Sequence, residues 1–293
     1  MEHRPFGKSG LTVSALGLGA GHIGSPELSE DAVARLLHGA VDIGVNLIDS
    51  ARSYGLSEER IGRHLAGRRH KAVLSTKVGY GIPGFQDWTG PCISAGIDAA
   101  LGRLQTDVID IVHLHSCPAE VALRADIQEA LTRARDAGKI RVAAYSGDND
   151  ALQHSIDSGR FGSIQASLNL CDQAVLKSGV PAAVRGGLGV IAKRPLANAP
   201  WRFDTPPDAQ DMREYWQRFR SMALDPRGLP WDELALRFTA FTPGVSTCIV
   251  GTSNIAHLGR CAEILQRGPL PGDVEAGIRD SFRRNGRDWM GQV

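Results

Sequence analysis

Three apolar runs of the sequence end on side chains that are suited to acid–base chemistry. Asp49 ends the run 45–48, and Tyr54 follows five residues later. Burying an unpaired carboxylate is costly, so Asp49 needs a cation as its partner. Lys77, near the end of the next apolar run, is the best candidate, and a third run ends in His115. We therefore expect these four side chains to lie together.

Such a set could polarise a carbonyl group while a nucleophile attacks its carbon. A lysine cation near a phenol favours the phenolate and lowers the tyrosine pKa from its usual value of about 10. Tyr54 could then give a proton to a substrate oxygen and later take it back. His115 could donate a second hydrogen bond to the same oxygen. Asp49 and Lys77 alone would also fit a structural ion pair.

The elements that must position these residues form eight strand–helix units. Apolar, β-rich runs at 13–20, 46–51, 71–79, 108–115, 140–146, 163–169, 189–195 and 246–252 are each followed by a helix-like stretch: 31–43, 57–67, 93–105, 127–139, 149–159, 173–186, 231–241 and 255–265. Strands this continuously apolar are covered on both faces. The pattern predicts a (β/α)8 TIM barrel formed by one domain over residues 1–293, in which strand ends carry the active site.

A doubly wound open sheet is the competing fold. It would place a G-x-G-x-x-G phosphate loop after an early strand, and "LGLGAG" lacks that spacing. The absence favours the barrel. The segment 197–230 interrupts the units, and its first part, 197–210, is rich in proline and polar residues and is predicted to be a rim loop.

Bulk properties exclude several classes of function. The 33 basic and 32 acidic residues give a net charge of +1, which favours neither nucleic acid nor a membrane surface as a partner. The five cysteines show no metal-type or disulfide spacing, so we expect a reducing compartment, the cytoplasm. The sequence shows no signal peptide and no apolar stretch long enough to span a membrane.

Several segments together resemble the aldo-keto reductase family. "IDSARSYGLSEERIG", "STKVG" and "DIVHLHS" resemble its signature segments, and "RPFGKSGLTVSALGLGAG" resembles its N-terminal β-hairpin, which closes the barrel floor, and first strand. The resemblance implies a catalytic tetrad of Asp49, Tyr54, Lys77 and His115. His115 is chosen over His113 because the family histidine lies five residues after the acid of its strand, here Asp110.

The resemblance also implies a nicotinamide dinucleotide that is bound without a Rossmann fold. Lys193 stands where the family often has an aromatic residue against the nicotinamide; its stem could cover the ring while its head reaches a phosphate. The tendency of the family implies NADP, with NAD possible. Of His257 and Arg260, the two residues of the last segment that could meet a 2′-phosphate, Arg260 is the better candidate because it is always charged. The implied cofactor contacts are Gly19, Ala20, Ser146, Gln165, Lys193, Arg194, Pro195, Leu196, Gly251, Thr252, Ser253, His257 and Arg260.

The predicted function is reversible NAD(P)H-dependent reduction of an aldehyde or ketone to an alcohol, with Tyr54 as the general acid. The partner is a small carbonyl or alcohol substrate, and the protein is expected to be a monomer or small homo-oligomer. A nucleotide-binding regulatory or sensor subunit with little turnover is the alternative.

Other candidate residues have simpler interpretations. No metal site is expected, because the H-x-H pair lacks further ligands, and His113 is predicted to be a hydrogen-bonded core histidine. Cys117 is predicted to be an inert thiol. One or two of four rim aromatics should line the substrate pocket while the others pack; they are Trp88, Trp201, Tyr215 and Trp216.

Overall fold

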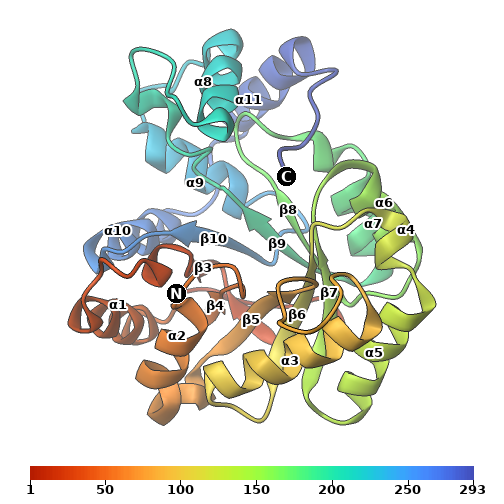
Figure 1. Ribbon diagram of the computed structural model, residues 1–293. Helices are drawn as coiled ribbons and strands as arrows, with labels where there is room; N and C mark the ends of the chain where they lie inside the picture. Colours follow the sequence, from red (N-terminus) through yellow and green to blue (C-terminus); the bar gives the residue numbers. More distant parts are fainter.

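Eight parallel strands close into a barrel at the centre of the molecule (Figure 1). The computed structural model describes all residues, 1–293. Around the barrel the order is β10-β3-β4-β5-β6-β7-β8-β9. Their bounds are Leu16–Gly19 (β3), Leu47–Asp49 (β4), Val73–Val78 (β5), Ile109–His115 (β6), Ile140–Ser146 (β7), Ser163–Ser167 (β8), Gly189–Lys193 (β9) and Thr247–Gly251 (β10). The predicted barrel and its eight strands are confirmed, and the open sheet is excluded.

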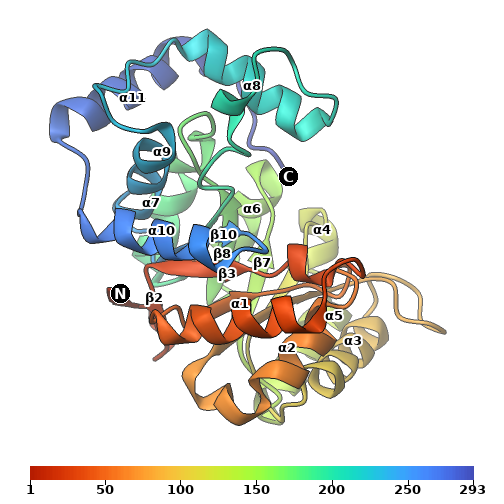
Figure 2. The ribbon, with the colours of Figure 1, turned by 90° about the vertical axis from the view of Figure 1, so that its left-hand side faces the viewer.

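Helices cover the outside of the barrel, as Figure 2 shows for α1 and α2. One helix lies between most successive strands: Glu30–Asp42 (α1), Ser57–Leu65 (α2), Gly90–Leu104 (α3), Ala125–Asp136 (α5), Asn149–Asp157 (α6), Gly179–Gly186 (α7) and Trp231–Ala240 (α9), with Ile255–Gln266 (α10) after the last strand. Shorter helical turns lie in the connecting loops: His22–Gly24 (η1), Ala66–Lys71 (η2), Ala119–Ala122 (α4), Ala174–Leu176 (η3) and Pro200–Arg202 (η4).

Local sequence explains how these helices begin and pack. In α1 the Ser29 side chain accepts a hydrogen bond from the Ala32 amide, and Glu30 lies in the positively polarised first turn. Leu36 and Leu37 are fully buried against the barrel. No helix is both long enough and apolar enough to cross a membrane.

The N-terminal hairpin closes the floor of the barrel, as predicted. Strands His3–Pro5 (β1) and Thr12–Ser14 (β2) pair antiparallel. Phe6 and Val13 are fully buried in one apolar cluster with strand residues of the barrel, including Ile111 and Ile191. The loop of the hairpin is tied to the barrel, because the Lys8 amide donates to the Gly187 carbonyl over 2.8 Å. The hairpin therefore covers this end of the barrel with apolar side chains.

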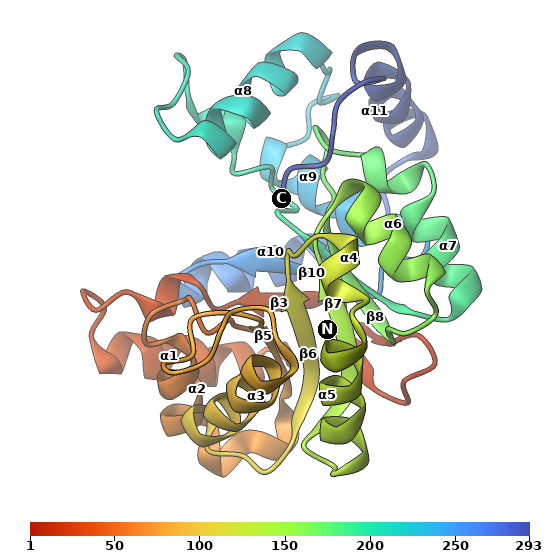
Figure 3. The same cartoon turned by 45° about the vertical axis from the view of Figure 1, so that its right-hand side comes forward.

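Two helices were not predicted, Gln210–Met222 (α8) and Gly272–Asn285 (α11). The predicted rim loop 197–210 is confirmed apart from the short turn η4, but the insert then folds into α8. Figures 1 and 3 show α8, α9 and α11 together on one side of the barrel. Tyr215, Leu234 and Phe282 join them in a second apolar cluster. The insert is thus a packed layer beside the barrel mouth.

Candidate active site

A cavity of about 1180 Å³ opens at the carboxyl ends of the strands. Its wall includes the last residues of several strands, among them Gly19, Asp49, His115 and Ser146. The four side chains that the sequence singled out, Asp49, Tyr54, Lys77 and His115, all line it. Side chains from separate runs of the sequence are therefore brought to one mouth.

Asp49 and Lys77 form a buried ion pair on neighbouring strands. The Lys77 Nζ atom donates to Asp49 Oδ2 over 2.6 Å and to the Ser50 carbonyl over 2.8 Å. Ser75 donates to Asp49 Oδ1 over 2.7 Å. Burial alone would raise the pKa of the Asp49 carboxyl, but Lys77 and the hydrogen bonds outweigh burial and hold it below the ordinary value. Burial would lower the pKa of Lys77, but Asp49 raises it, so both groups stay charged.

Tyr54 and His115 lie beside this pair. The Lys77 Nζ atom lies 5.0 Å from the centroid of the Tyr54 ring, and the Tyr54 and His115 rings meet edge to face with centroids 6.2 Å apart. Burial first, and then the nearby Lys77 charge, lower the pKa of His115 to about 4. His115 is therefore neutral near pH 7 and keeps one ring N–H for donation.

The loop that carries Tyr54 is fixed by close backbone packing. A side chain at Gly24 would collide with the Tyr54 carbonyl, so only glycine fits there. The Leu56 amide donates to the Gly24 carbonyl over 3.1 Å. Ser57 donates to the Ala20 carbonyl over 2.8 Å. Ala20 itself, a predicted cofactor residue, is fully buried and supports this loop rather than lining the cavity.

The two histidines of β6 have different surroundings. His113 is fully buried, as predicted for a core histidine, but neither of its ring nitrogens has a hydrogen-bond partner. The backbone of Tyr145, on the neighbouring strand β7, is a polar group close to the ring. Burial lowers the pKa of His113 to about 3, so the ring is neutral. No group of three or more histidine, cysteine, aspartate or glutamate side chains is placed to hold a metal ion.

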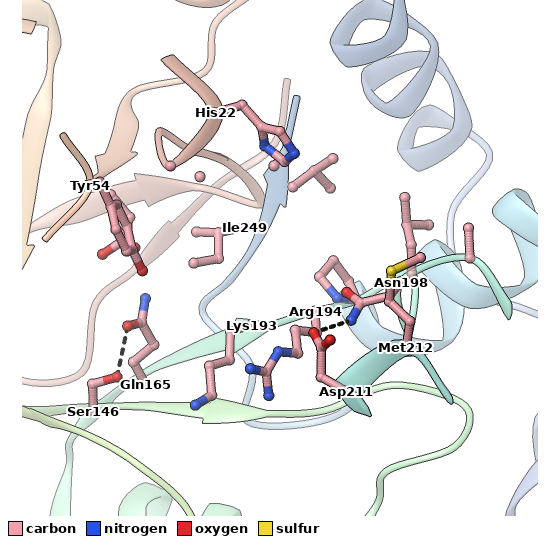
Figure 4. A pocket seen from close by; sticks show the side chains of 18 of the residues that line it. His22, Tyr54, Ser146, Gln165, Lys193, Arg194, Asn198, Asp211, Met212 and Ile249 are labelled. Carbon is pink, nitrogen blue, oxygen red and sulfur yellow. Dashed lines mark hydrogen bonds between the residues drawn. The ribbon is translucent and has the colours of Figure 1, made fainter. Parts of the chain in front are cut away.

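Most of the predicted cofactor residues line the same cavity. They are Gly19, Ser146, Gln165, Lys193, Arg194, Pro195, Leu196, Gly251 and His257. Thr252, Ser253 and Arg260 lie outside its wall, like Ala20. Thr252 instead accepts the Asn254 amide through its hydroxyl, at the turn that leads into α10. Figure 4 shows several of the lining side chains converging on one space.

Ser146 and Gln165 form a paired set of groups that suits an amide ligand. The Ser146 hydroxyl donates to Gln165 Oε1 over 3.0 Å, which leaves the buried Gln165 Nε2 without a partner. Figure 4 shows this nitrogen on the side facing Tyr54. A buried amide N–H without an acceptor is costly, so a ligand carbonyl is the natural partner. The carboxamide of a nicotinamide ring fits this requirement.

Lys193, the last residue of β9, and Arg194, the next residue, make contacts that the sequence did not predict. The Lys193 Nζ atom lies 2.9 Å from the buried Asp148 carboxylate, so its head does not reach outward to a phosphate. Its stem still lines the cavity. Arg194, with a positive φ of 57°, donates to the backbone carbonyls of Gln292 and Val293 over 2.8 and 3.0 Å. Its guanidinium thus borders the cavity while bound to the C-terminal segment.

Arg260 forms an ion pair with Asp232, with 2.9 Å between Nε and Oδ2. Asp232 lines the cavity together with His257, whereas Arg260 does not. The hydrogen bond from Arg260 to Asp232 raises the pKa of the guanidinium further, so Arg260 is a permanent charge. Any 2′-phosphate bound by Arg260 would lie close to this carboxylate.

Sequence reasoning missed several residues of the wall. Tyr80 lies three residues after Lys77, on the loop that follows β5. This place in a βα loop is the only feature of the sequence that could have predicted Tyr80 as a residue of the wall. His22 comes from η1, and Asp232 and Trp231 begin α9 after the unpredicted part of the insert. Of the four rim aromatics, only Trp201 lines the cavity, and Trp88, Tyr215 and Trp216 do not. The expectation that one or two of these aromatic residues line the pocket is confirmed.

Cys117 is buried, and burial raises the pKa of its thiol to about 12. Both features disfavour the thiolate, the reactive form of cysteine, in line with the prediction of an inert thiol. All five cysteines are free and buried.

A (β/α)8 barrel with ionisable side chains gathered at the carboxyl ends of its strands has the layout of a barrel enzyme. The model of the aldo/keto reductase family matches residues 15–280. The chain therefore belongs to the aldo/keto reductase family, as its motifs indicated, and it is an oxidoreductase.

Named relatives agree with this membership. The chain is 29% identical over 276 residues to an L-galactose dehydrogenase of Arabidopsis thaliana, covering 88% of this chain and 86% of the relative. It is 31% identical over 222 residues to an L-glyceraldehyde 3-phosphate reductase of Escherichia coli, covering 67% and 62%. An aldo-keto reductase structure from Bacillus halodurans, in its holo form, has a TM-score of 0.84 at 26% identity and covers 96% of each chain.

Proposed function

We propose that this protein catalyses the reversible, NAD(P)H-dependent reduction of an aldehyde or ketone to an alcohol. The observation that carries the proposal is the meeting, in one cavity, of Tyr54, the Lys77–Asp49 pair and His115 with the unpartnered amide of Gln165. The relatives include one named as a dehydrogenase and one named as a reductase, which supports a reaction that can run as oxidation or as reduction.

Each side chain has a distinct role in the proposed reaction. A bound reduced nicotinamide dinucleotide would supply the hydride. Tyr54 and His115 bind the carbonyl oxygen of the substrate, and Tyr54 donates the proton that completes the alcohol. Lys77 stabilises the negative charge that Tyr54 carries after donation, and Asp49 orients Lys77 through the 2.6 Å contact. Ser146 and Gln165 would hold the carboxamide and so orient the nicotinamide.

The direct test is purified protein mixed with NADPH or NADH and a panel of aldehydes and ketones. We expect loss of the reduced-nicotinamide absorbance and formation of an equal amount of alcohol. Tight nucleotide binding without oxidation by any carbonyl, together with a stable protein partner in pull-down experiments, would instead support a regulatory subunit. Size-exclusion chromatography would test whether the protein is the proposed monomer or small homo-oligomer. Cell fractionation would test the proposed cytoplasmic location.

NADPH is proposed as the preferred nucleotide, with NADH kept as the alternative. The proposal depends on Arg260, whose charge must serve a 2′-phosphate while it also pairs with Asp232. Titration of both nucleotides, followed by fluorescence, should show tighter binding of NADPH, and Arg260→Ala should remove that preference without weakening NADH. Equal affinity of the unmodified protein for both nucleotides would mean that Asp232 neutralises Arg260 and no 2′-phosphate site exists.

A further inference from the structure

Tyr80 is the closest partner of His115. The Tyr80 hydroxyl lies 2.9 Å from His115 Nδ1, and the two rings stack with centroids 5.6 Å apart and an interplanar angle of 22°. Both residues line the cavity. Tyr80 is therefore in contact with the second hydrogen-bond donor of the proposed reaction, but not with the Asp49–Lys77 pair.

The loop around Tyr80 is held in place on both sides. The Trp88 ring packs against Tyr80 with centroids 5.6 Å apart, and the Trp88 amide donates to the Gly79 carbonyl over 2.7 Å. Gly79 has a φ of 142°, and a side chain there would collide with the Trp88 ring. Arg52, from the Tyr54 loop, donates to the Gly81 carbonyl over 2.9 Å. These contacts fix the direction of the Tyr80 hydroxyl.

A neutral imidazole carries one proton, on either Nδ1 or Nε2. A donor that hydrogen-bonds to one of the two nitrogens leaves the proton on the other. The His115 ring is neutral near pH 7, because burial lowers its pKa to about 4. A phenol that donates to Nδ1 places the ring proton on Nε2. The Tyr80 hydroxyl has one proton and can also donate it to Ser53 Oγ, over the longer distance of 3.3 Å. The unprotonated imidazole nitrogen is the nearer and the more basic of the two acceptors, and Ser53 can in turn donate its own hydroxyl proton to Tyr80. Donation to His115 is therefore the favoured arrangement.

We propose that Tyr80 is a positioning residue that holds His115 in the tautomer with its proton on Nε2, so that His115 donates to the substrate oxygen. The inference rests on the proposed function only for its catalytic consequence. Without Tyr80, the proton can move to Nδ1, and Nε2 then becomes an acceptor that repels a carbonyl oxygen.

The experiment is NMR of the histidine ring nitrogens in isotope-labelled protein, with His115 assigned by the signal lost in His115→Gln. The unmodified protein should show Nδ1 as the unprotonated nitrogen. Tyr80→Phe keeps the stacked ring and should shift both His115 signals toward a mixture of tautomers. Ser53→Ala, the matched control, should leave them in place. A protonated Nδ1 in the unmodified protein, or unchanged signals in Tyr80→Phe, would overturn the proposal.

Kinetics provides the second readout. Tyr80→Phe should lower kcat for carbonyl reduction by about tenfold, the scale of one hydrogen bond, and leave the KM for the nucleotide unchanged. A shifted tautomer with an unchanged kcat would overturn the catalytic consequence, namely that the Nε2 proton of His115 assists carbonyl reduction. If the protein reduces no carbonyl at all but the NMR result holds, the proposed function fails and the tautomer assignment stands.

Discussion

Replacing Lys77 by methionine should leave the Asp49 carboxylate buried without its cation. The two side chains are only 3% and 2% exposed, and their charged atoms lie 2.6 Å apart. Breaking a buried pair from one side costs about 3–5 kcal/mol, because the remaining charge is uncompensated. The free energy of unfolding, measured by urea denaturation near pH 7, should fall by about that amount in Lys77→Met.

The sign of the pH dependence follows from the pKa of Asp49. In the unmodified protein this pKa is lowered, so the contribution of Asp49 to stability is present above its unfolded pKa and is lost as pH falls through the folded pKa. In Lys77→Met, burial acts without the lysine and raises the pKa. The variant therefore loses stability as pH rises above about 4, the unfolded value, and the gap to the unmodified protein widens toward neutral pH.

Two controls make the result specific. Lys139 and Asp98 form an exposed pair with the same 2.6 Å separation, so Lys139→Met should cost about 0–1 kcal/mol. Adding Asp49→Asn to Lys77→Met removes the stranded charge and should recover part of the lost stability. A Lys77→Met protein that loses no more stability than Lys139→Met, with no pH dependence, would refute the buried-pair reasoning.

Further predictions concern His115, Gln165 and Arg260. Because the pKa of His115 is lowered to about 4, its ring signals should not titrate between about pH 5.5 and 9 in NMR spectra, and a titration near pH 6.5 would contradict its burial. Gln165→Ala should weaken the binding of the nicotinamide nucleotide by about tenfold, because it removes the unpartnered amide from the cavity. Gln153→Ala, on helix α6 and outside the cavity wall, should leave the affinity unchanged, and a Gln165→Ala protein that binds as tightly as the unmodified one would show that this amide holds no ligand. Arg260→Ala should remove the preference for NADPH in fluorescence titrations, and a persistent preference would place the 2′-phosphate elsewhere.

The barrel could be predicted because its information is local. The strands are largely apolar runs covered on both faces, as in β6, and some helices begin at a capping side chain, such as Ser29 before α1. The tetrad followed from the same logic, because parallel strands bring their carboxyl ends to one edge. Asp49, Lys77 and His115 end or nearly end neighbouring strands, so their meeting needed only the topology.

The rest depended on contacts that no local pattern encodes. Helix α8 carries many charges and is held by burying Tyr215 and Phe219 against α9 and α11, a tertiary effect. The partner of Lys193 is Asp148, in the loop between β7 and α6, so the Lys193 charge is neutralised by a carboxylate of another βα unit. The contact of Arg260 with Asp232 likewise joins two different helices, α10 and α9, across strand β10 in the sequence. Residue type alone could not distinguish a free cation from a paired one.

The most direct test of the account is the turnover of Tyr54→Phe compared with its affinity for the nucleotide. The substitution removes the hydroxyl that donates the proton and keeps the ring beside Lys77. We expect kcat for carbonyl reduction to fall by about 10² or more, while the nucleotide dissociation constant stays nearly unchanged. A Tyr54→Phe enzyme that reduces carbonyls as fast as the unmodified protein would contradict the central claim.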